Sequence, residues 1–110
     1  MTLTEHFSFA EVVNSATASN DGIDNSLPEA MMGNALIAAQ GMEQVRSLLC
    51  HHIDVTSWYR CHALNHAVGG APGSAHLEAF AVDFVCPEFG TPLAIVHSPS
   101  TLVKVVFPPG

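Results

Sequence analysis

The stretch Gly69-Gly70-Ala71-Pro72-Gly73-Ser74-Ala75-His76-Leu77-Glu78-Ala79-Phe80-Ala81-Val82-Asp83-Phe84 decides how this chain is organised. Its glycine-rich opening predicts a turn, because regular elements rarely continue through such a segment and glycine tolerates positive φ. The largely apolar run from Leu77 to Phe84 then predicts a buried strand. His76 lies at the start of this run, and Asp83 follows seven residues later.

A carboxylate on a buried strand needs a cation, a hydrogen-bond donor or a metal, because unpaired charge is costly to bury. Zinc binds nitrogen and carboxylate oxygen at about 2.0–2.2 Å, and would satisfy His76 and Asp83 together. On spacing alone, a structural His–Asp pair without metal is an equal alternative.

The pattern Ser74-x-His76-x-x-Ala79-x-Ala81-x-Asp83 resembles the Ser-x-His-x-x-Gly-x-Ala-x-Asp signature of the D-Ala-D-Ala carboxypeptidase family of zinc peptidases. That family shares its fold with the hedgehog signalling domain and includes many phage endolysins. The resemblance implies that His76 and Asp83 are two of three Zn²⁺ ligands. Ala79 stands where the family usually has glycine.

Further matches to the family follow the same order along about residues 3–95. They are Leu3-Thr4-Glu5-His6-Phe7, Gly22-Ile23-Asp24-Asn25, Thr56-Ser57-Trp58-Tyr59-Arg60, Leu64-Asn65 and Val68-Gly69-Gly70. The family's strand motif is usually Ser-Gly-Tyr-Arg, so Trp58 occupies a glycine position. The resemblance implies a metallopeptidase that hydrolyses peptidoglycan stem peptides, as a D-Ala-type carboxypeptidase or an endopeptidase.

The composition is that of one folded domain spanning residues 1–110, with 48% hydrophobic and 12% charged residues. Ten acidic residues against three basic ones give a formal charge of −7. We therefore expect neither nucleic acid nor an anionic membrane as a partner, since both favour a basic surface. A small peptide or cell-wall fragment is compatible with this charge, and the oligomeric state is left open.

The N-terminus Met1-Thr2-Leu3-Thr4-Glu5-His6 has neither the basic region nor the apolar run of a signal peptide. We expect synthesis in the cytoplasm without a signal peptide, and action at the bacterial cell wall if this is a phage lysis protein. Three cysteines without C-x-x-C spacing favour free thiols over a disulfide.

The order of the expected elements predicts an α+β fold, in which a small antiparallel sheet packs against N-terminal helices. The motif Ser8-x-x-Glu11 is a capping box. The expected elements are a helix over 9–15, a loop over 17–27, a long amphipathic helix starting at Pro28, a strand over 53–59, a helix over 61–68, a strand reaching 85, a helix over 91–97 and a last strand over 102–107.

Two further residues are candidates for binding substrate. Arg60 is one of three basic residues and ends an apolar strand. A guanidinium can bind a substrate carboxylate through two hydrogen bonds, and a surface salt bridge is the alternative role. Ser74 could donate to substrate or orient His76, and a plain turn serine is an equal alternative.

The third zinc ligand and the general base are not evident in the sequence. A zinc peptidase needs three protein ligands and a base for the attacking water. The family supplies both from a later segment, which we expect to be truncated or altered after Ile95. His97 is the candidate replacement ligand, and Glu78 is the candidate base because strand alternation would place it on the face of His76. The alternative function is a catalytically silent module that binds zinc or cell-wall peptide.

Overall fold

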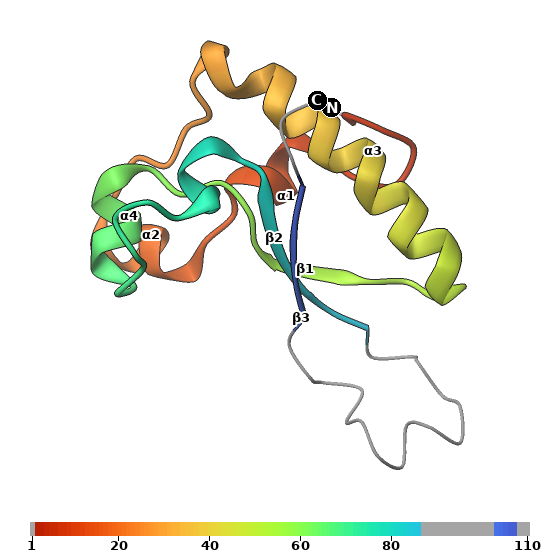
Figure 1. Ribbon diagram of the computed structural model, residues 1–110. Helices are drawn as coiled ribbons and strands as arrows, with labels where there is room; N and C mark the ends of the chain where they lie inside the picture. Colours follow the sequence, from red (N-terminus) through yellow and green to blue (C-terminus); the bar gives the residue numbers. More distant parts are fainter. Residues whose placement is uncertain (1, 87–102, 108–110) are drawn as a thin grey trace.

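The computed structural model describes residues 2–86 and 103–107 (Figure 1). The described elements, in chain order, are α1 (Phe9–Val13), α2 (Ala16–Asp21), the 3-10 turn η1 (Glu29–Met31), α3 (Met32–Leu49), β1 (Asp54–Ser57), α4 (His62–Ala67), the 3-10 turn η2 (Ala75–Glu78), β2 (Ala81–Val85) and β3 (Val103–Val106). The expected α+β class with an antiparallel sheet is confirmed.

The sheet has the order β1-β2-β3, with β2 paired antiparallel to both neighbours. Asp83 lies near the middle of β2, opposite Ser57 of β1 and Lys104 of β3. The register of β1 shifts between Val55 and Ser57, directly opposite Asp83. Such irregularities re-aim side chains next to functional sites.

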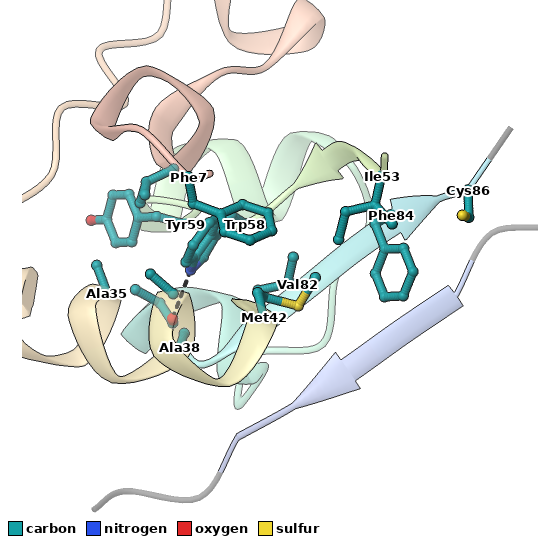
Figure 2. Close-up of a cluster of buried hydrophobic side chains, with 13 residues drawn as sticks. Phe7, Ala35, Ala38, Met42, Ile53, Trp58, Tyr59, Val82, Phe84 and Cys86 are labelled. Carbon is teal, nitrogen blue, oxygen red and sulfur yellow. Dashed lines mark hydrogen bonds between the residues drawn. The ribbon is translucent and has the colours of Figure 1, made fainter. Parts of the chain in front are cut away.

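The hydrophobic core lies between α3 and the sheet (Figure 2). Ala38 and Met42 of α3 pack with Val82 of β2, and all three are fully buried. Trp58 is also fully buried and lies edge-on to Phe7, with ring centroids 6.1 Å apart. The amphipathic stripe predicted for the long helix is confirmed at its centre, although Leu48 near its end is 84% exposed.

A glycine in α3 lets the last strand approach the helix. A Cβ atom at Gly41 would overlap the ring of Phe107, which follows β3. The amide of Phe107 donates to Phe80 O at 2.8 Å and fixes the chain beyond β3. Gly41 therefore weakens the helix locally but provides the surface on which Phe107 packs.

The predicted capping box is confirmed at α1. Ser8 Oγ accepts from the Glu11 amide, and Glu11 Oε1 accepts from the Ser8 amide at 2.9 Å. The loop predicted over 17–27 is wrong in its first part, because α2 spans Ala16–Asp21. Ser15 caps the start of α2, and Gly22 ends it with φ 67°, so strong caps compensate for weak helix formers.

The strand predicted from Leu77 is also wrong at its start. Residues Ala75–Glu78 form η2, and β2 begins only at Ala81. Ser74 caps this turn and Ala79 ends it with a left-handed φ of 64°. Ala79 occupies the position where the family signature has glycine, which adopts this conformation without steric cost.

The other predicted elements that fall on described residues agree with the structure within a few residues. Pro28 precedes η1 and not α3 itself, and the strand expected over 53–59 is the shorter β1. The last strand is confirmed as β3, while the helix predicted over 91–97 lies outside the described residues.

Within the described residues, no helix is both long and apolar enough to cross a membrane. Cys50 and Cys61 carry free thiols, as expected.

Candidate metal centre and substrate site

His76 is fully buried, and the segment after β1 holds it at two points. Its Nδ1 lies 2.6 Å from Trp58 O, and its own carbonyl accepts the Arg60 amide at 3.0 Å. Because a carbonyl can only accept, Nδ1 carries the proton and the neutral ring presents a lone pair at Nε2. A backbone carbonyl that fixes the tautomer in this way is typical of a metal-ligating histidine.

The Nε2 atom of His76 has no hydrogen-bond partner, although it is buried. Asp83 Oδ2 lies 3.2 Å from it, which is close enough for an ion pair but lacks hydrogen-bond alignment. Burial lowers the pKa of His76, and the positive charges of Arg60 and Lys104 act in the same direction, whereas Trp58 O and Asp83 oppose them. The lone pair of the neutral His76 ring at Nε2 therefore faces the lone pairs of the Asp83 carboxylate.

His76 Nε2 and Asp83 Oδ2 can both donate lone pairs to a cation placed between them. Nitrogen and carboxylate oxygen are zinc ligands, and the bond to the metal would satisfy the orphaned Nε2. His76 and Asp83 are thus brought together as the sequence predicted. Within residues 2–86 and 103–107, no group of three His, Cys, Asp or Glu side chains could hold a metal. His97, the candidate third ligand, lies outside these residues.

Arg60 also points into this site, with a protein partner at each guanidinium nitrogen. Its Nε donates to Ser57 Oγ at 3.2 Å and its Nη1 to Asn65 Oδ1 at 3.3 Å. Its Nη2 lies 3.6 Å from Asp83 Oδ2, and the two side chains are only 16% and 12% exposed. The guanidinium is thereby fixed against the carboxylate of Asp83.

Asn65 ties Arg60 to the glycine-rich turn. This buried side chain accepts from Arg60 and donates to Ala71 O at 2.9 Å, while its backbone carbonyl accepts from Gly70 N at 2.8 Å. A Cβ atom at Gly70 would overlap Asn65 Oδ1 and lie 3.1 Å from Arg60 Nη1. Glycine is therefore required here by close packing.

Ser74 acts on the backbone of η2. Its Oγ accepts the His76 amide at 3.2 Å, so it orients the turn that carries the histidine. Ser74 also lines a depression of about 280 Å³ together with His62, Leu77 and Glu78. Ser74 thus supports His76 and borders a hollow where a ligand could lie.

The argument that placed Glu78 beside His76 is wrong, because these residues lie on a 3-10 turn and not on a strand. Glu78 is exposed, and its carbonyl accepts from Asn34 Nδ2 at 3.0 Å. Its role as a general base stays a prediction, now without the support of strand alternation.

Sequence reasoning missed three participants in the site. The carbonyl of Trp58 gives no sequence signal, because it is a backbone atom. Asn65 matched the family pattern without an assigned role. Lys104 lies directly across from Asp83, and the scarcity of basic residues in this acidic chain was the signal that could have identified it.

Comparison with known proteins agrees with the geometry. A family model described as Peptidase M15 matches residues 5–98, which includes every predicted site residue. No curated protein and no solved structure matches the chain significantly.

Proposed function

Since the chain belongs to the Peptidase M15 family, and so has a zinc peptidase-like domain, we propose that it hydrolyses peptidoglycan stem peptides. The bond cut would be next to a D-alanyl residue, as in D-Ala-type carboxypeptidases or endopeptidases. The observation that carries this proposal is the buried pair of His76 and Asp83, in which Nε2 has no hydrogen-bond partner and lies 3.2 Å from a carboxylate oxygen.

His76 and Asp83 would hold the zinc ion in this proposal. When bound, zinc would act as a Lewis acid that activates water and polarises a carbonyl. Trp58 O keeps the proton of the neutral His76 ring on Nδ1, so that Nε2 is available as a ligand. Arg60 lies against Asp83, with 3.6 Å between Nη2 and Oδ2, and would contact the carboxylate or carbonyl of the peptide.

The remaining groups of the mechanism are also proposals. His97 would be the third ligand, and Glu78 would take the proton from the attacking water. Ser74 would keep η2 in place and line the hollow beside it. The protein would act at the bacterial cell wall, as phage endolysins do.

Release of D-alanine from a purified muropeptide tests this function. The zinc-loaded protein should release D-alanine, or cut the stem peptide internally, and His76→Ala should abolish both. An exposed histidine on α4 provides the matched control, since His66→Ala should retain activity. No cleavage by folded, zinc-loaded protein would reject the peptidase proposal for this chain.

A silent binding module is the second candidate function. It is favoured because, among the described residues, no group of three His, Cys, Asp or Glu side chains could hold a metal. Such a module would bind a muropeptide without releasing D-alanine. Isothermal titration with the same muropeptide, beside the cleavage assay, separates the two candidates.

A further inference from the structure

Most of the lysine and arginine residues of this chain lie at the candidate site. Only three of its 110 residues are lysine or arginine, against ten acidic residues. Two of the three, Arg60 and Lys104, flank Asp83. In a chain of net charge −7, such a concentration of positive charge at one carboxylate is unexpected from packing alone.

Lys104 and Asp83 share one face of the sheet. They are directly opposite partners in the antiparallel pair of β2 and β3. Side chains of opposite residues lie on the same face, with Cβ atoms about 4.5–5.5 Å apart.

The two cations differ in how they are engaged. Every guanidinium nitrogen of Arg60 has a partner in the protein. The ammonium group of Lys104 makes no hydrogen bond or ion pair with residues 2–86 or 103–107, and the residue is exposed. Arg60 is therefore already paired with Asp83, whereas Lys104 is available to a ligand.

The charge balance of the site favours an anion. Beside the neutral His76, the negative charge of Asp83 is matched by Arg60, and Lys104 adds one positive charge that has no partner among the described residues. A bound zinc ion would increase this excess. An ammonium group beside a partly buried site attracts carboxylates by charge-assisted hydrogen bonding.

We infer that Lys104 binds the terminal carboxylate of a peptide ligand, while Arg60, which lies against Asp83, would contact the carbonyl of the same peptide. The identity of the ligand as a D-alanyl peptide rests on the proposed function. The carboxylate-binding role itself rests on the register of β2 with β3 and on the free ammonium group. It makes Lys104 the residue that distinguishes a free C-terminus from a blocked one.

The test is an NMR titration of the full-length, zinc-free protein with N-acetyl-D-alanine and with its C-terminal amide. The acid should shift the backbone amide signals of β2 and β3, and the amide should not. Lys104→Ala should weaken binding of the acid about two- to fivefold, as expected for one partly exposed charge pair. Lys104→Glu should weaken it further, and Lys104→Arg should restore it.

Arg46→Ala is the matched control, because it removes the one other positive charge, which lies in the last turn of α3. It should leave the affinity for the acid unchanged. The inference is overturned if wild type does not distinguish acid from amide, or if Lys104→Ala binds the acid as tightly as wild type.

Turnover separates this inference from the proposed function. If carboxylate binding depends on Lys104 but no muropeptide is cleaved, the binding role stands and the peptidase proposal fails. If muropeptide is cleaved with the same KM in wild type and Lys104→Ala, the peptidase proposal stands and the role of Lys104 is wrong.

Discussion

The indole Nε1 of Trp58 donates to Ala79 O at 2.9 Å, and this hydrogen bond joins the two positions at which the sequence departs from the family motifs (Figure 2). Both positions usually hold glycine in the family. Trp58 fills the core beneath the site, and its own carbonyl binds His76. Ala79 ends η2 in the left-handed conformation. The two departures are therefore coupled in space and support the turn that carries His76.

Replacing Trp58 by phenylalanine tests this coupling. The Trp58→Phe variant keeps an aromatic ring but leaves the buried Ala79 carbonyl without its indole donor. We expect a loss of about 1–3 kcal/mol in the free energy of unfolding, measured by urea denaturation. Tyr59→Phe is the control, because this hydroxyl makes no hydrogen bond with the described residues and its removal should cost less than about 0.5 kcal/mol. Equal losses in the two variants would contradict the coupling.

The two glycines of α3 should respond in opposite directions to alanine. Gly41→Ala forces the ring of Phe107 to move, and should destabilise the protein by about 1–3 kcal/mol. Gly33→Ala has nothing within 4 Å of the new methyl group, and should stabilise the helix by up to about 1 kcal/mol. Thermal unfolding of both variants measures the difference. Stabilisation of similar size in both would show that Phe107 does not pack on Gly41.

Asn65 should matter for both stability and the site. Asn65→Ala removes the acceptor for Arg60 Nη1 and the donor for Ala71 O. We expect the free energy of unfolding to fall by about 1–3 kcal/mol, because both groups lose a partner. Asn20→Ala, at an exposed position of α2, should have little effect. Urea denaturation of the pair is the measurement, and similar losses in both would contradict the assigned role of Asn65.

Stability of the zinc-free protein should depend on pH through His76. Burial lowers the pKa of His76 in the folded state below the ordinary value of 6.5. As pH falls below 6.5, the unfolded chain therefore binds the proton more readily than the folded one, and stability decreases. Well above 6.5 the histidine is neutral in both states and has no effect on stability.

Urea denaturation in a chelating buffer between about pH 7.5 and pH 5 measures this loss. The His76→Gln variant provides the reference, because it lacks the titrating group. The wild type should lose more stability than the variant over this range. Parallel pH profiles of the two proteins would show that protonation of His76 does not oppose folding.

The sequence predicted those parts of the fold that depend on local chemistry. Ser8 and Glu11 form the expected capping box, and α3 follows from its apolar stripe. The failures lie where tertiary contacts outweigh local pattern. Neither α2 nor η2 has a helical pattern of apolar residues, and each is defined by its caps at Ser15 and Ser74.

The pairing of His76 with Asp83 was predictable because both belong to one motif. The partners from other segments were not, since Trp58 and Asn65 contribute through a carbonyl and an amide whose positions only the folded chain fixes. Lys104 required the strand register, which brings it opposite Asp83. The pattern of a single strand carries no information about which residue of another strand will face it.

Zinc content per chain, measured by elemental mass spectrometry after zinc loading and desalting, tests the central claim most directly. We predict close to one zinc per chain in wild type and in the exposed-residue control His66→Ala. We predict little or none in His76→Ala and Asp83→Asn. Folded wild type without zinc, or zinc retained at one per chain in both site variants, would contradict a metal centre built on His76 and Asp83.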